Sequence, residues 1–140
     1  MSGKYFLDTN IFVYSFDTRD QSKQTKAQYL IEQAINQQAG CISYQVAQEF
    51  INVATRKFQR PLSPADAAIY FSNILEPLCE IYASSHLFGQ ALELAEHWKY
   101  AFYDALIIAS AIHASCHTLY SEDLQHGQQI GHLKIINPFA

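Results

Sequence analysis

The sequence lacks any apolar run long enough to cross a membrane. None of its apolar stretches approaches the ~20 residues that a spanning helix needs, and no charged-then-apolar segment of the kind that directs secretion stands at its N-terminus. Its three cysteines, Cys41, Cys79 and Cys116, are far apart and show no paired spacing. These absences predict a cytoplasmic protein with reduced, buried cysteines and no membrane association.

Charge is also scarce. Only 16% of the residues are charged, against about 25% in average soluble proteins. The net charge of −4 excludes a protein that coats nucleic acid by bulk electrostatic attraction. A nucleic-acid substrate would have to be held locally or through metal ions. Two small basic groups are candidates for phosphate contacts, with an ordinary solvated surface as the alternative: Arg19, Lys23 and Lys26, and Arg56, Lys57 and Arg60.

Motifs of several common site classes are missing. The sequence contains no HExxH motif, no paired cysteines of a zinc site and no obvious Ser, Cys or His triad. The nearest histidine pair, His113 and His117, straddles a predicted helix end and has no third ligand. We therefore expect neither zinc chemistry nor a side-chain nucleophile.

The length of 140 residues predicts a single domain, residues 1–140. Short apolar runs predict strands at residues 4–7, 41–43, 80–83, 116–120 and 134–136. Helical spacing predicts helices at residues 10–16, 21–37, 44–58, 64–78, 84–97 and 103–114. Asn10, Ser63 and Ser84 or Ser85 are the candidate N-caps. This alternation predicts the α/β class, with a mostly parallel central sheet of four to five strands and helices on both faces.

Four acidic residues stand where the chain leaves or enters these apolar elements. Asp8 and Asp123 follow predicted strands, Glu49 lies about one turn into a helix, and Asp104 opens the most apolar helix. Each has an ordinary explanation alone: a helix cap, a solvated helix residue, an acid favoured by the helix dipole, or a turn residue. Because ligands of such folds bind beyond the carboxyl ends of the strands, their joint placement predicts one acidic site.

Clustered carboxylates need a cation. Two unit charges 4 Å apart repel by about 4 kcal/mol at an effective dielectric constant of 20. Carboxylate-rich oxygen sites suit Mg²⁺ or Mn²⁺ better than zinc. Such an ion can activate water and neutralise phosphoryl oxygens, so the pattern points to hydrolysis of a phosphodiester.

The motifs carry a family resemblance over nearly the whole chain. They are Phe6-Leu7-Asp8-Thr9-Asn10, Gln48-Glu49-Phe50, Tyr103-Asp104-Ala105-Leu106-Ile107, Leu119-Tyr120-Ser121-Glu122-Asp123-Leu124 and Ile136-Asn137-Pro138-Phe139. In this order they resemble the PIN-domain ribonucleases, and specifically the VapC toxins of bacterial toxin–antitoxin pairs. The resemblance implies that Asp8, Glu49, Asp104 and Asp123 are the metal-binding and catalytic acids. Ser121 stands where the family often has Thr and keeps the hydroxyl.

The resemblance also implies an α/β/α sandwich, endonucleolytic RNA cleavage dependent on Mg²⁺ or Mn²⁺, homodimerisation and inhibition by a cognate antitoxin. An RNA-maturation nuclease of the same fold and a non-catalytic module that binds RNA or protein are the alternatives. A phosphatase of the haloacid dehalogenase type needs a second Asp where Asn10 stands. Asn10 is expected to support Asp8 or to cap the following helix. Glu122 is expected to point away from the site that Asp123 enters.

Overall fold

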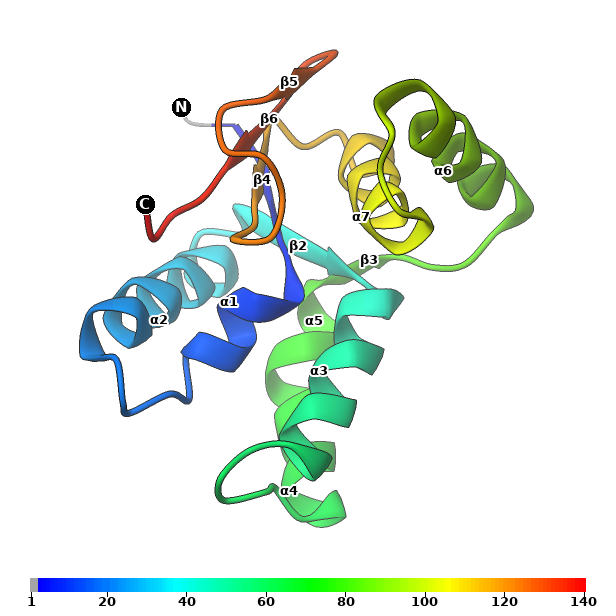
Figure 1. The fold of residues 1–140 in the computed structure, drawn as a ribbon. Helices are drawn as coiled ribbons and strands as arrows, with labels where there is room; N and C mark the ends of the chain where they lie inside the picture. The colour runs from blue at the N-terminus through cyan, green and yellow to red at the C-terminus, as the bar shows by residue number, and fades with distance from the viewer. Residues whose placement is uncertain (1–2) are drawn as a thin grey trace.

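The centre of the molecule is a six-stranded sheet. The computed structural model describes residues 3–140 and orders the strands β3-β2-β1-β4-β6-β5 (Figure 1). The bounds are Tyr5–Leu7 (β1), Gly40–Ser43 (β2), Cys79–Ile81 (β3), Thr118–Tyr120 (β4), Gln129–Ile130 (β5) and Leu133–Ile136 (β6). Strands β1, β2, β3, β4 and β6 run parallel, and β5 pairs antiparallel with β6. The expected mostly parallel sheet is confirmed.

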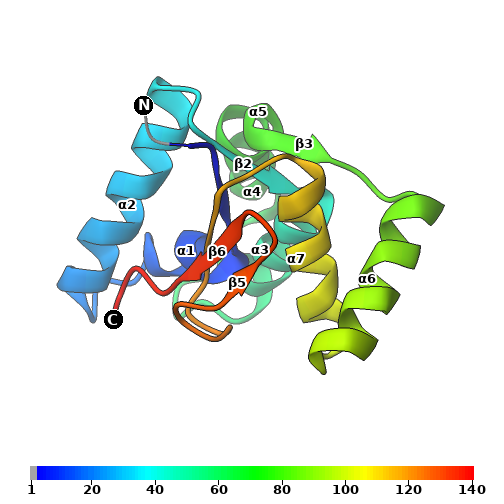
Figure 2. The same cartoon turned by 90° about the horizontal axis from the view of Figure 1, so that it is seen from above.

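Helices cover both faces of the sheet. The bounds are Thr9–Tyr14 (α1), Gln21–Asn36 (α2), Tyr44–Arg56 (α3), Pro64–Tyr70 (α4), Phe71–Leu75 (η1), Glu76–Leu78 (α5), Ser85–Trp98 (α6) and Phe102–His113 (α7). Seen from above, α2 lies on one side of the strands and α7 with α6 on the other (Figure 2). Every residue of α7 from Ala105 to Ala111 is buried, as its apolar sequence predicted.

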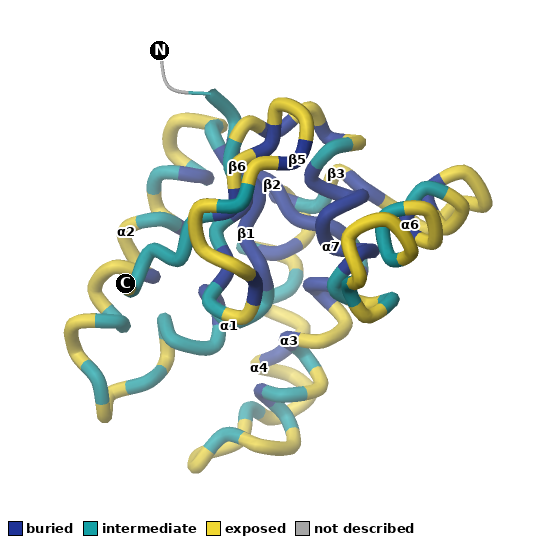
Figure 3. Tube along the Cα trace, turned by 45° about the horizontal axis from the view of Figure 1, so that its top comes forward, coloured by how far each residue is buried: buried dark blue, intermediate teal, exposed yellow. Residues whose placement is uncertain are grey.

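The core runs through these layers. Strand β1, hydrogen-bonded on both sides, is buried at all three of its positions, which is the usual state of a central parallel strand. Figure 3 shows the sheet and α7 as the buried centre, with exposed residues on α6 and around α4. None of the helices over residues 3–140 combines the length and apolar content needed to cross a bilayer.

Three local details differ from the sequence prediction, and a fourth decides between two predicted caps. Asp8, and not Asn10, caps α1, since the backbone at Asp8 is extended and its carboxylate accepts from the Thr9 N–H. The helix predicted over 64–78 contains the wider turn η1 just before Pro77, which has no N–H to continue the regular pattern. Ser84 caps α6. Strand β5 lies outside the predicted elements because two residues carry no readable period.

Candidate active site

Four elements bring the four acids to one end of the sheet. Asp8 joins β1 to α1, Asp123 follows β4, Glu49 lies on α3, and Asp104 lies in the first turn of α7. Strands β1 and β4 are parallel neighbours, and the Asp8 N–H donates to the Tyr120 carbonyl at 3.0 Å. Their carboxyl ends therefore lie side by side, which places the residues that follow them at one edge.

Asp8 is the buried member of the group. It is only 8% exposed, and its two carboxylate oxygens accept from the Thr9 N–H at 2.7 Å and from the Ser121 hydroxyl at 2.6 Å. Burial raises the pKa of Asp8 to about 6 against these hydrogen bonds, and the charges of Asp123 and Glu49 raise it further. A carboxylate held this firmly with no cation beside it has a strong preference for a positive partner.

Ser121 connects two of the acids. Its hydroxyl donates to Asp8 and accepts from the Asp123 N–H at 3.2 Å. The Asn10 side-chain amide donates to the Asp123 carboxylate at 3.2 Å. The expectation that Asn10 supports Asp8 or caps a helix is thus corrected, because its side chain holds Asp123. Ser121 is the residue that bonds to Asp8.

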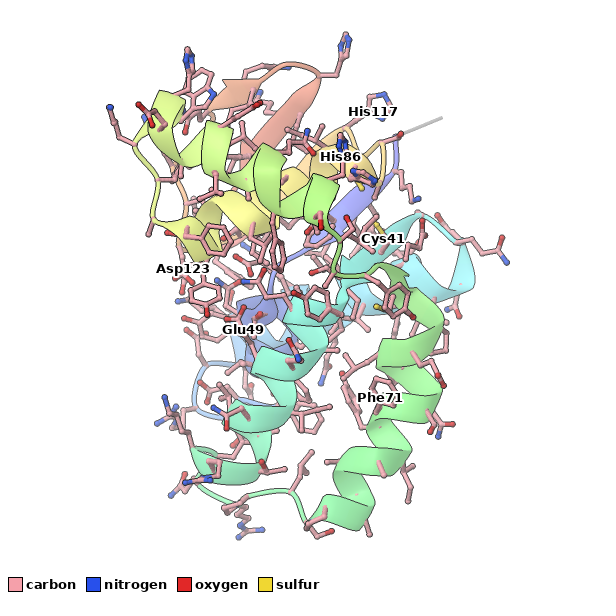
Figure 4. The ribbon with its side chains drawn as sticks, turned by 90° about the vertical axis from the view of Figure 1, so that its right-hand side faces the viewer. Cys41, Glu49, Phe71, His86, His117 and Asp123 are labelled. Carbon is pink, nitrogen blue, oxygen red and sulfur yellow. The ribbon has the colours of Figure 1, made fainter. Side chains whose placement is uncertain are left out.

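Glu49 and Asp104 complete the cluster from the other side. Burial raises the pKa of Glu49, opposed by a hydrogen bond from Gln45, and the charges of Asp104 and Asp123 raise it further. Burial and the charge of Asp123 raise the pKa of Asp104. These mutual electrostatic effects show that the four acids lie close enough to repel one another. Figure 4 shows Glu49 and Asp123 near each other on the same side of the molecule.

Gln45 is a supporting residue that sequence reasoning missed. Its side-chain amide donates to Glu49 at 2.9 Å and to the Tyr103 carbonyl at 3.3 Å, so it ties α3 to the beginning of α7. The signal available in the sequence is its position four residues before Glu49, since such pairs face each other on a helix. The contact with α7 depends on the tertiary structure alone.

The neighbouring residue Glu122 belongs to a different cluster. Its carboxylate accepts from Lys23 at 2.7 Å and from the Tyr14 hydroxyl. Burial pushes the pKa of Glu122 upward, but the hydrogen bonds from Lys23 and Tyr14 outweigh burial and hold the pKa below its usual range. Glu122 thus turns away from the four acids, as the sequence predicted, although the segment after β4 is a bend and not a strand.

Among residues 3–140, none of the four acids forms an ion pair with a basic residue. The three ion pairs within residues 3–140 involve Glu80, Asp17 and Glu122. Around the acids, four buried polar atoms have no hydrogen-bond partner among the described residues: Thr9 Oγ1, Asn10 Oδ1, Ser43 Oγ and Gln45 Oε1. Hard oxygen donors and uncompensated negative charge fit a hard divalent cation.

The acids do not form a tight cage in this structure. Within residues 3–140, no three His, Cys, Asp or Glu side chains are arranged to hold one ion jointly. Mg²⁺ is usually bound through one or two carboxylates and several waters, so it does not require three protein ligands placed together. The donor chemistry therefore fits the ion, and the remaining acids would act through water or through substrate.

The family model for the PIN domain matches residues 5–128. The chain belongs to the PIN-domain family. No curated protein matches it in sequence.

Solved structures share the PIN fold. A chain of a toxin–antitoxin complex from Klebsiella pneumoniae superposes with a TM-score of 0.69 at 20% identity, covering 96% of this chain and 98% of that one. VapC20 from Mycobacterium tuberculosis, a toxin that cleaves the sarcin–ricin loop, gives 0.64 at 24% identity, covering 86% and 90%. VapBC2 from Rickettsia felis, bound to a promoter DNA fragment, gives 0.60 at 20% identity, covering 94% and 96%.

Proposed function

We propose that this PIN domain, taken as residues 1–140, is an endoribonuclease that hydrolyses RNA phosphodiester bonds with Mg²⁺ or Mn²⁺. The observation that carries the proposal is the convergence of Asp8, Glu49, Asp104 and Asp123 from four separate elements, with no ion pair to a basic residue in the described part of the chain. Such a group of carboxylates raises the free energy of the folded chain unless a cation joins it. A function that uses such a cation would explain why the chain places four carboxylates together.

In the proposed mechanism the acids hold the ion, directly or through water. Asp8, Asp104 and Asp123, with Glu49, would share this role, and the metal when bound would neutralise phosphoryl oxygens and lower the pKa of a water. Ser121 fixes the orientation of Asp8, Asn10 that of Asp123 and Gln45 that of Glu49. A water oxygen then bonds to phosphorus as one bond between phosphorus and a ribose oxygen breaks.

The toxin role rests on the structural neighbours. One comes from a toxin–antitoxin complex, one is a VapC toxin and one is a VapBC assembly. We extend that role to this chain as a cytoplasmic toxin, with a cognate antitoxin as its protein partner and a homodimer as its assembly. An RNA-maturation nuclease shares the fold, and target mapping separates the two roles.

Cleavage by the purified protein tests the proposal. We expect wild type to cut RNA with Mg²⁺ or Mn²⁺, and we expect Asp8→Asn or a chelator to stop it. Glu122→Gln is the matched control, because Glu122 is adjacent to the site but pairs with Lys23. Cleavage that persists in Asp8→Asn and in chelator would refute the carboxylate–metal mechanism. Sequencing RNA ends after brief induction of wild type and Asp104→Asn identifies the target.

A further inference from the structure

A hollow lies at the C-terminal ends of α1 and α3, the helices that follow Asp8 and carry Glu49. A cavity of about 820 Å³ opens between the end of α1 with the loop after it and the end of α3 with its following loop. Both helices start at the end of the sheet and lead away from it (Figure 1). The size of the cavity is within the ~300–1,000 Å³ of pockets that hold small organic groups.

Two aromatic rings line this pocket. Phe16 and Phe58 line it, with their ring centroids 5.5 Å apart. Phe16 also packs against Phe50 at 5.7 Å and Tyr70 at 5.3 Å, yet it remains 37% exposed. A large ring held by neighbouring rings and open to solvent on one side is a rigid surface on which a planar group can stack.

Three basic residues also line the pocket: Lys57, Arg60 and Arg19. Arg19 pairs with Asp17, whereas Lys57 and Arg60 take part in none of the ion pairs within the described residues. Cations from two distant sequence segments therefore meet at one cavity in a chain whose net charge is −4. The loop that carries them is anchored, because Lys57 N–H donates to the Val53 carbonyl and Leu62 N–H to the Ala54 carbonyl.

Helix α3 connects the pocket to the acids. Val53 lines the pocket and stands four residues after Glu49, about 6 Å along the helix axis, and Lys57 stands four residues farther, at about 12 Å. A polyanionic strand whose scissile phosphate lies at the acids would therefore reach the pocket within a few nucleotides. A stacking surface with nearby cations is the arrangement that binds single-stranded nucleic acid.

We propose that this pocket holds an unpaired nucleotide of the RNA substrate, a few positions away from the cleaved bond. The base stacks on Phe16 and Phe58, and Lys57 and Arg60 contact the adjoining phosphates. The inference rests on the proposed ribonuclease function and adds to it a requirement for single-stranded RNA on one side of the cut. An acidic, aromatic peptide is the competing occupant.

Binding of a labelled single-stranded RNA oligonucleotide by fluorescence anisotropy tests the pocket, in Mg²⁺ and on the Asp8→Asn background so that no cleavage occurs. We expect Lys57→Gln with Arg60→Gln to weaken binding about 10- to 100-fold and to make the slope of log K against log salt shallower by about 1.4. Phe16→Leu, which keeps apolar volume but removes the ring, should weaken binding about fivefold or more. The matched control, Lys99→Gln with Lys134→Gln, removes equal charge outside the pocket.

The outcomes separate the two proposals. If RNA binds and wild type cleaves it, but the pocket variants lose no more affinity than the control, the pocket proposal is wrong and the nuclease stands. If wild type neither cleaves nor binds RNA, the nuclease proposal fails and the pocket proposal with it. If only binding of an acidic, aromatic peptide depends on Phe16, Lys57 and Arg60, the pocket docks protein and not RNA. A thermal melt of each variant confirms that it is folded.

Discussion

Two neighbouring carboxylates, Asp123 and Glu122, lie in opposite electrostatic environments. Glu122 receives a lysine and a tyrosine hydroxyl from the chain itself, and its pKa is held low. Asp123 lies with three other acids. Asp123, Asp8 and Glu49 accept hydrogen bonds from neutral groups, and the pKa values of Asp8, Glu49 and Asp104 are raised. Residues 3–140 thus supply a cation where a carboxylate fixes structure and supply none where the proposed chemistry takes place.

The RNA cleavage rate should show the largest difference between the two regions. Asp8→Asn keeps the shape of the side chain but removes a charge from the cluster of four acids (the uncompensated region), and we expect it to lower the cleavage rate by at least about 100-fold. Glu122→Gln removes a charge from the cluster of Glu122, Lys23 and Tyr14 (the compensated region), and it should leave the rate within about threefold. Single-turnover cleavage of one RNA with both variants makes the comparison. Equal losses would mean that the two regions do not differ in function.

The pH dependence of stability should differ in sign between the two regions. The pKa of Asp8 is about 6 in the folded chain and about 3.9 in an unfolded chain, so the folded state binds more protons between these values. In chelator, Asp8 therefore lowers the free energy of unfolding as pH rises from about 4 to about 6, by about 3 kcal/mol. Glu49 and Asp104 act in the same direction. Glu122 acts oppositely, because its lowered pKa adds stability that is lost as pH falls.

Urea unfolding across this pH range measures the effect. The difference between wild type and Asp8→Asn should grow with pH and then level off above about pH 6, with the variant becoming the more stable protein. The difference between wild type and Glu122→Gln should have the opposite sign. A wild type that gains stability from pH 4 to 6 relative to Asp8→Asn would contradict the account of Asp8.

Metal binding should offset part of the loss of stability that the charged Asp8 causes. A cation that binds only the folded protein stabilises it by about 2.7 kcal/mol at one hundred times its dissociation constant. We expect Mn²⁺ or Mg²⁺ to raise the Tm of wild type and of Glu122→Gln alike, and to change that of Asp8→Asn much less. Calorimetric melts with and without the ion are the measurement. Equal shifts in all three proteins would place the ion elsewhere.

The sequence predicted one of the two regions far better than the other. The four acids were readable because each stands at the end or beginning of an apolar element, and alternating strands and helices bring those points to one edge. Whether they bind metal stays a prediction. The role of Asn10 was wrong in detail because Asp8 has both the extended backbone and the carboxylate that a cap needs.

Contacts between distant segments were not readable. The attachment of Gln45 to α7, the pairing of Lys23 with Glu122 and the meeting of Arg19 with Lys57 and Arg60 each depend on how helices pack. The spacing of apolar residues along the sequence carries no information about these contacts. Strand β5 was missed for a related reason, since a two-residue strand is defined by its partner β6 and by the turn at Gly131, which has a φ of +59°.

The smallest expected effect comes from Lys23→Met, which tests whether the compensated region depends on its cation. The Lys23 ammonium lies 2.7 Å from Glu122, 3.3 Å from the Tyr14 hydroxyl and 4.5 Å from the centre of the Tyr14 ring. Methionine keeps the apolar stem but removes the charge, so the pKa of Glu122 should rise. Because partly exposed ion pairs contribute little, the Tm should fall by only about 2 °C. NMR titration of Glu122 gives the pKa, and an unchanged value would show that Tyr14 and the local backbone, not the lysine, keep this carboxylate ionised.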